Sequence, residues 1–259
     1  MGSIIESFPK RREKEGVSRE TRGSKLEQLM PLLEDEAEKL RTRGFPLTDD
    51  LRIDPLAFKG TYTVDDIQRD ARRVYEREGQ FKKGGDIGKL LEVVKTLAFN
   101  RLWFRGKFVA VRTARYDDIF NNIDEIIFDV ETHTPLAVVD TTTDLESKLG
   151  DPEFLEKLKK GGAIKYGLGL EANGVSKKNY PKLPIFIVSL RADDVRSLAD
   201  ELLKGGPITE TSVLLERVIV QELRMQSDKL GMHNNIPKFP ENIRQGYIES
   251  QTVFDHLAA

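Results

Sequence analysis

The chain contains no cysteine. This absence excludes a disulfide-stabilised fold, a thiolate nucleophile, an iron–sulfur cluster and every zinc site built on cysteine. Histidine is almost as scarce, because the only three are His133, His233 and His256, too far apart in sequence to form a short-spaced pair of metal ligands. Any bound metal ion must therefore be held by oxygen ligands.

Long apolar runs are also missing. No stretch approaches the roughly 18 uncharged apolar residues of a transmembrane helix, and residues 1–22 contain no apolar segment of the signal-peptide type. We therefore predict a cytoplasmic protein without a membrane partner. The 41 basic and 43 acidic residues give a net charge of −2, so the overall charge does not favour binding to a polyanion. Binding to nucleic acid would have to come from a local basic patch.

The pattern along the 259 residues predicts four regions. Glycine, serine and mixed charges predict a loosely ordered tail over residues 1–24. Residues 25–80 form a helical region, in which a capping box of Thr63 and Asp66 begins the second helix. An α/β core occupies residues 81–230, and residues 231–259 form a mostly irregular tail.

The core region predicts a mixed α/β fold. Its residues 86–103 have the nearly all-round apolar pattern of a buried helix, and the continuous apolar run 136–139 predicts a central strand. The apolar stripe of the last helix fits either core packing or a homodimer face. The expected elements are helices over 86–103, 152–160, 193–204 and 209–227, strands over 107–112, 123–130, 135–141, 163–171 and 183–190, and a loop over 172–182.

Three acidic residues occupy suggestive places on these elements. Glu92 lies inside the apolar helix, Asp124 opens the second strand and Asp140 ends the third. A hairpin between those strands would place Asp124 and Asp140 side by side, and oxygen ligands alone select Mg²⁺, Mn²⁺ or Ca²⁺. The simpler readings remain open: Glu92 pairs with a core arginine such as Arg112, and the aspartates cap strand or helix ends.

This order of elements and acids resembles the PD-(D/E)xK nuclease superfamily, over roughly residues 85–205. The resemblance implies a restriction-endonuclease-like αβββαβ core with a mixed central sheet, in which Glu92, Asp124 and Asp140 hold Mg²⁺ or Mn²⁺. Thr142 stands where the family carries its motif lysine. Lys165 on the following strand is the first candidate to replace that lysine, and Lys148 is the second. Without a replacement, the chain would be an inactive member of the fold.

Basic residues suggest where a nucleic acid would lie. Between residues 151 and 182 there are seven lysines and four acids. A solvated helix face followed by a loop explains the same lysines without a ligand. The predicted nucleic-acid contacts are Arg112, Arg115, Lys157, Lys160, Lys177 and Lys178. The sequence therefore predicts metal-dependent hydrolysis of nucleic acid, with DNA favoured over RNA and with Glu92, Asp124, Asp140 and Lys165 as catalytic residues. The alternative is an inactive nuclease-like fold that binds nucleic acid or protein.

Overall fold

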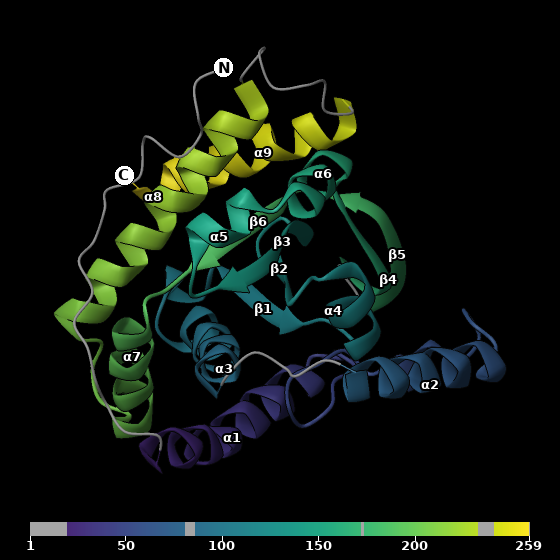
Figure 1. Ribbon diagram of the computed structural model, residues 1–259, viewed down its shortest axis with the longest axis horizontal. Coiled ribbons are helices and arrows are strands. Elements are labelled where there is room, and N and C mark those ends of the chain that lie inside the picture. Colours follow the sequence, from purple (N-terminus) through teal and green to yellow (C-terminus); the bar gives the residue numbers. More distant parts are fainter. Residues whose placement is uncertain (1–19, 81–85, 172–173, 233–240, 259) are drawn as a thin grey trace.

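A computed structural model describes residues 20–80, 86–171, 174–232 and 241–258. The protein is a mixed α/β structure around a four-stranded sheet of order β1-β2-β3-β6 (Figure 1). Strands β1 to β3 are antiparallel neighbours, whereas β3 and β6 run parallel. A separate hairpin joins β4 and β5. The strands are β1 (Phe108–Arg112), β2 (Glu125–Asp129), β3 (Thr134–Thr142), β4 (Gly162–Glu171), β5 (Gly174–Leu183) and β6 (Ile185–Ser189).

Helices cover the sheet and its edges. The predicted tail over residues 1–24 lies partly outside the described residues, and its last residues, from Glu20, belong to the first helix. No helix among the described residues combines the length and apolar composition needed to cross a bilayer. The helices are α1 (Glu20–Arg41), α2 (Val64–Gln80), α3 (Asp86–Arg101), α4 (Arg115–Asn121), α5 (Leu145–Gly150), α6 (Pro152–Lys160), α7 (Ala192–Lys204), α8 (Glu210–Met232) and α9 (Glu241–Ala258).

One hydrophobic core runs through most of these elements. Helix α3 buries its apolar residues, including Val94 and Leu97, and packs against β1 and β3. Helix α1 lies against α3 and α7 and adds Leu29 and Leu33 to the same cluster. Part of the predicted N-terminal helical region therefore shares its core with the α/β region.

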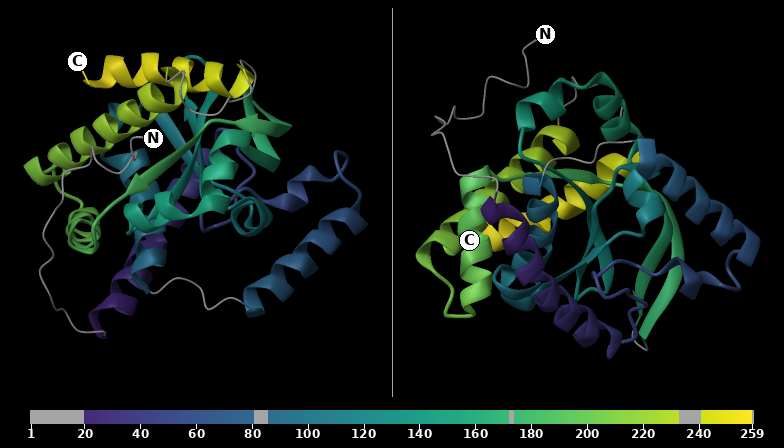
Figure 2. Two further views of the ribbon diagram at one scale, coloured as in Figure 1. Left: turned by 45° about the horizontal axis from the view of Figure 1, so that its top comes forward. Right: turned by 60° about the horizontal axis from the view of Figure 1, so that its bottom comes forward.

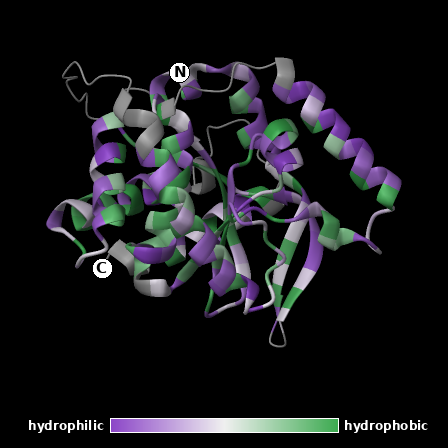
Figure 3. Cartoon of the chain, turned by 90° about the horizontal axis from the view of Figure 1, so that it is seen from below, coloured by the Kyte–Doolittle hydropathy of each residue, from purple (hydrophilic) through white to green (hydrophobic). Residues whose placement is uncertain are grey.

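Helix α2 buries fewer side chains in the core than α1 and α3 do. It begins with the predicted capping box, because Thr63 Oγ1 accepts from the Asp66 amide while Asp66 Oδ2 accepts from the Thr63 amide. The helix extends away from the body of the protein and is mostly hydrophilic (Figures 2 and 3). Among its described side chains, Ile67 and Asp70 are the buried ones. Helix α2 therefore contacts the core mainly through one narrow face.

Two sequence-based assignments are wrong. Residues 172–182 were expected to form a loop, but most of them belong to β5. The lysines and Pro181 of this exposed strand do not give the apolar pattern from which a strand is predicted. Residues 231–259 were expected to be mostly irregular, yet Glu241–Ala258 form α9. The three residues Ile243, Tyr247 and Phe254 face the core from α9, and their spacing is helical. The intervening residues 233–240 lie outside the described ranges.

Helices α8 and α9 pack side by side and cover the free edge of β6 (Figures 1 and 2). Gln226 of α8 bonds to both the amide and the carbonyl of Ile187, at 2.8 Å each. The Tyr247 hydroxyl of α9 accepts from the Ile185 amide at 3.1 Å and donates to its carbonyl at 2.8 Å. Side chains thus satisfy the outer backbone groups that an edge strand would otherwise expose.

We predict that Tyr247→Phe destabilises the protein. The substitution keeps the buried ring but leaves the Ile185 amide and carbonyl without partners, at a cost of about 2–4 kcal/mol in the free energy of unfolding. Urea denaturation followed by circular dichroism measures the change. Tyr75→Phe on α2 is the matched control, because Tyr75 is highly exposed, and it should change stability little. Equal stability of the two variants would contradict the edge-covering role of α9.

Candidate active site

Asp124 and Asp140 lie next to each other at one end of the sheet, where β2 begins and β3 approaches its end. The pair Glu125 and Val139 is in register, and the Asp124 amide donates to the Val139 carbonyl at 2.9 Å, so the next opposed positions are Asp124 and Asp140. The end of β1, the start of β2 and the end of β3 all reach this edge. The predicted adjacency of the two aspartates is therefore present in the fold.

Burial makes this pair electrostatically strained. Only 5% of the Asp140 side chain is exposed, against 15% for Asp124. Burial and the negative charge of Asp124 together raise the pKa of Asp140 to about 6, against the opposing effect of Lys148. The Asp140 carboxyl Oδ2 is buried and lies against the Lys148 ammonium. A positive ligand at this place would relieve the repulsion.

Two lysines lie near Asp124 and Asp140, which are called the acid pair below: Lys148 on α5 and Lys157 on α6. Lys148 Nζ lies 2.8 Å from Asp140 Oδ2, and 26% of the Lys148 side chain is exposed. Lys157 Nζ donates to the Asn122 carbonyl at 3.0 Å, just before Asp124 in the chain. The pKa of Lys157 is lowered to about 8, mainly by burial and also by the charge of Lys148, against the opposing charge of Asp140. The charges of both ammonium groups therefore interact with the acid pair.

A buried network of polar side chains, centred on Lys95 of α3, supports Asp124. Lys95 of α3 is fully buried, and its Nζ lies 3.1 Å from Glu125 Oε2 and 4.0 Å from Asp124 Oδ2. The same ammonium bonds to Thr141 Oγ1. Asp124 Oδ2 also accepts from the Thr141 amide at 2.8 Å. Sequence analysis missed Lys95, although it lies three residues after Glu92 in an otherwise apolar helix.

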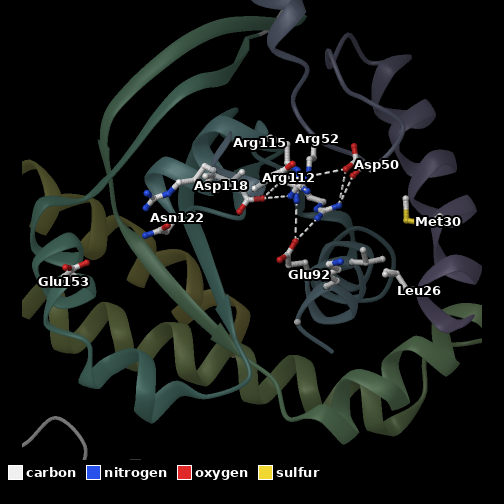
Figure 4. A pocket seen from close by; sticks show the side chains of 16 residues that line it. Leu26, Met30, Asp50, Arg52, Glu92, Arg112, Arg115, Asp118, Asn122 and Glu153 are labelled. Atoms are coloured by element: carbon white, nitrogen blue, oxygen red, sulfur yellow. Dashed lines mark hydrogen bonds and ion pairs between the residues drawn. The ribbon is translucent and has the colours of Figure 1, made fainter. Parts of the chain in front are cut away.

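Glu92 lies on the other side of Asp124, in a cluster of arginines. Its Oε2 is 2.8 Å from Arg112 Nη2 and 3.4 Å from Arg52 Nη2 (Figure 4). Burial raises the pKa of Glu92, and the charge of Asp124 raises it further, while Arg112 lowers it. The alternative interpretation of Glu92 as the partner of Arg112 is therefore confirmed. Glu92 also remains close enough to Asp124 to respond to its charge.

These arginines line a cavity of about 740 Å³ at the same edge of the sheet. Figure 4 shows Arg52, Arg112 and Arg115 converging between Asp50, Glu92 and Asp118. The cavity extends from α1 to α6, where Met30 and Glu153 lie at its two ends. Asn122, two residues before Asp124, is also in its wall. The cavity therefore offers space for a ligand beside the two aspartates.

The structure does not bring Lys165 to the acid pair. Lys165 Nζ lies 2.5 Å from Asp70 Oδ2 of α2, within 4.9–5.4 Å of the ring centres of Tyr62, Tyr116 and Tyr166. The predicted placement of Lys165 beside the aspartates is therefore corrected. Side chains alternate along β4, but the sequence does not show that α2 supplies a buried aspartate to receive this lysine.

We predict that Lys165→Met lowers stability without removing any chemistry at the acid pair. Asp70 would remain buried without its cation, which costs about 2–4 kcal/mol in the free energy of unfolding. Urea denaturation measures this loss, and Lys159→Met is the control because Lys159 pairs with Glu156 at the surface. Unchanged stability of Lys165→Met would contradict the structural role.

The predicted nucleic-acid contacts fall into two groups. Arg112 is buried and lies 3.6 Å from Asp50 as well as against Glu92, so it belongs to the cavity wall rather than to the outer surface. Arg115 is partly exposed and pairs with Glu78 and Asp118. The remaining lysines lie on α6 and β5, where Lys157 is half-buried and Lys160, Lys177 and Lys178 are exposed.

The residues fit a magnesium ion only in a two-carboxylate arrangement. Among the described residues, no group of three histidine, aspartate or glutamate side chains forms a ready metal centre. Mg²⁺ commonly uses one or two carboxylates, with substrate phosphate and water filling its other positions. Asp124 and Asp140 provide two carboxylates at one place, and the repulsion between their charges favours a cation there. The arginines already hold Glu92, so Glu92 fits a role beside the ion rather than on it.

No protein-family model matches this chain, and comparisons with curated proteins and with solved structures also give no match.

Proposed function

We propose that the protein is a divalent-metal-dependent phosphodiesterase that acts on nucleic acid, with DNA favoured over RNA. The observation that carries the proposal is the pair of opposed aspartates at the sheet edge, with the Lys148 ammonium 2.8 Å from Asp140. The order α3, β1, β2, β3, α5–α6 and β6, with β3 and β6 parallel, supports a restriction-endonuclease-like core into which α4 and the β4–β5 hairpin are inserted.

The residues suggest a division of labour. Mg²⁺ or Mn²⁺ held by Asp124 and Asp140 would polarise a phosphate and acidify a bound water. Lys148 replaces Lys165 as the candidate for the missing motif lysine. Its ammonium can donate to a phosphate oxygen and stabilise the negative charge that builds up during phosphodiester cleavage. Lys95 acts from behind as a positioning residue, because it holds Thr141 and Glu125 on both sides of Asp124.

Cleavage of labelled nucleic acid tests the proposal. The purified full chain is incubated with single-stranded DNA, double-stranded DNA or RNA in the presence of Mg²⁺, Mn²⁺ or EDTA. We expect products only with a divalent ion. Absence of products from every substrate with both ions, or equal cleavage in EDTA, would refute the proposal.

A second candidate function is binding without cleavage. It is favoured by the contacts of Glu92 with two arginines, because these contacts occupy the carboxylate that would otherwise assist a metal ion. A gel shift at increasing salt concentration separates the two functions, because phosphate contacts weaken as salt rises. Salt-sensitive binding without any cleavage would select the second candidate.

A further inference from the structure

A second cavity, of about 400 Å³, lies beneath α2. Its walls are mostly apolar and include two of the three tyrosine rings that surround Lys165, those of Tyr116 and Tyr166. Pockets of this kind, in which a few polar groups converge on an apolar space, are typical sites for small ligands. The apolar walls come from Ile53, Pro55, Leu56, Ile67, Ala71, Val74, Tyr116 and Tyr166.

The apolar cavity adjoins the arginine-lined cavity. Both are lined by Asp50, Arg52 and Arg115, so these residues form the boundary between the two spaces. Only 5% of the Arg52 side chain is exposed. Its buried Nε makes no hydrogen bond of good geometry within the described part of the chain, although Asp50 Oδ2 lies 3.2 Å away. A buried guanidinium whose Nε contact with Asp50 is poorly aligned thus stands where the two cavities meet.

We propose that the two cavities together bind one mononucleotide unit. The base would occupy the apolar cavity against the partly exposed Tyr116, because aromatic faces stack on bases of any sequence. The phosphate would lie in the arginine-lined cavity against Arg115 and Arg52, in exchange for part of their contacts with carboxylates, since guanidinium groups match phosphate geometry. This inference deepens the proposed function by assigning an unpaired nucleotide of the substrate to this site, and it rests on that function for the identity of the substrate.

The charges of the boundary explain why both halves are needed. Arg115 is held by Glu78 and Asp118, and Arg52 lies 3.1 Å from Asp118 and 3.2 Å from Asp50. A phosphate must compete with these carboxylates, so phosphate alone should bind weakly. A base alone would lack the arginine contacts. Asp50, with 38% of its side chain exposed, can accept from an N–H group of the base.

Calorimetry in EDTA tests the proposal on the full chain without requiring cleavage. The probes are adenosine monophosphate, adenosine and inorganic phosphate. We expect the monophosphate to bind at least 10-fold more tightly than either of its parts. Ala71→Trp places a bulky ring in the apolar cavity and should weaken monophosphate binding at least 10-fold while leaving phosphate binding unchanged. The matched control is Gln68→Trp, since Gln68 is exposed on α2 and outside the cavity lining.

The outcomes separate this inference from the proposed function. Lack of monophosphate binding, or equal binding by Ala71→Trp and wild type, overturns the mononucleotide site whether or not the chain cleaves nucleic acid. Monophosphate binding that Ala71→Trp abolishes and Gln68→Trp preserves supports the site even if no cleavage occurs. Circular dichroism of both tryptophan variants verifies that each one is folded.

Discussion

Asp140→Asn is expected to reduce metal-dependent cleavage by about 1,000-fold or more, because it removes one of two carboxylates that hold the ion and the charge that Lys148 faces. The shape of the side chain is nearly unchanged, so the loss would come from charge rather than packing. Initial rates measured at pH 8 with saturating Mg²⁺ give the ratio of the variant to wild type. A variant that keeps most of its metal-dependent activity would exclude Asp140 from the site.

The same substitution should stabilise the protein at pH 8. The folded-state pKa of Asp140 is raised to about 6, so the folded protein binds the proton more tightly than the unfolded chain does. The stability from this group is complete below the ordinary pKa of 3.8 and is lost as the pH rises through about 6. Asparagine cannot lose a proton there, so the variant should gain on the order of 1–3 kcal/mol in unfolding free energy at pH 8.

Asp144→Asn is the matched control for both measurements. Asp144 begins α5 near Asp140 in the chain, its Oδ1 accepts from the Ser147 amide, and asparagine is an equally good helix cap. The control should keep wild-type activity and stability. Burial also raises the pKa of Asp117 to about 6, so wild type should lose stability between pH 4 and pH 7 through both groups. Asp140→Asn should show a shallower loss, and an unchanged slope would contradict the burial argument.

The sequence predicts the sheet of this protein well because local patterns determine it. The continuous apolar run of β3 and the short loop before it were enough to oppose Asp124 and Asp140. Helix α6 was also predictable, since Asp151 caps it and Pro152 occupies its first turn. Each of these features depends on residues that are neighbours in the chain. The restriction-endonuclease-like assignment of the fold remains a proposal built on them.

The parts that escaped prediction depend on contacts between distant segments. Lys165 is held by Asp70, 95 positions away, and the Arg52 to Glu92 contact spans 40 positions. No pattern among neighbouring residues of the sequence predicts such distant partners. The α9 helix was missed because its apolar residues are few and widely spaced, and they become informative only when β6 needs its edge covered. Lys148 is the second sequence-based candidate for the motif lysine, behind Lys165, because Lys165 lies on a predicted strand and Lys148 in a predicted helical region.

Lys148→Met is expected to reduce cleavage by about 100-fold, which is the usual cost of removing one charged donor from a developing phosphate charge. Its effect on the pH profile is more informative than its size. Lys148 lowers the pKa of Asp140, so removing the ammonium should raise that pKa further in the metal-free protein. Because Asp140 must lose its proton before it can bind the ion, the acidic limb of the activity profile at subsaturating Mg²⁺ should then move to higher pH. A residue with a purely structural role would reduce the rate without moving the limb.

Two further variants separate charge from position in the Lys148 experiment. Lys148→Arg keeps the positive charge near Asp140, so it should hold the acidic limb near its wild-type pH and recover part of the rate. Lys159→Met removes an exposed lysine that pairs with Glu156 on α6 and should change neither quantity. If Lys148→Met lowers the rate with the limb unmoved, Lys148 does not tune Asp140. The half-buried Lys157, whose pKa is already lowered to about 8, then becomes the residue to substitute next, because it is the other ammonium that senses both aspartates.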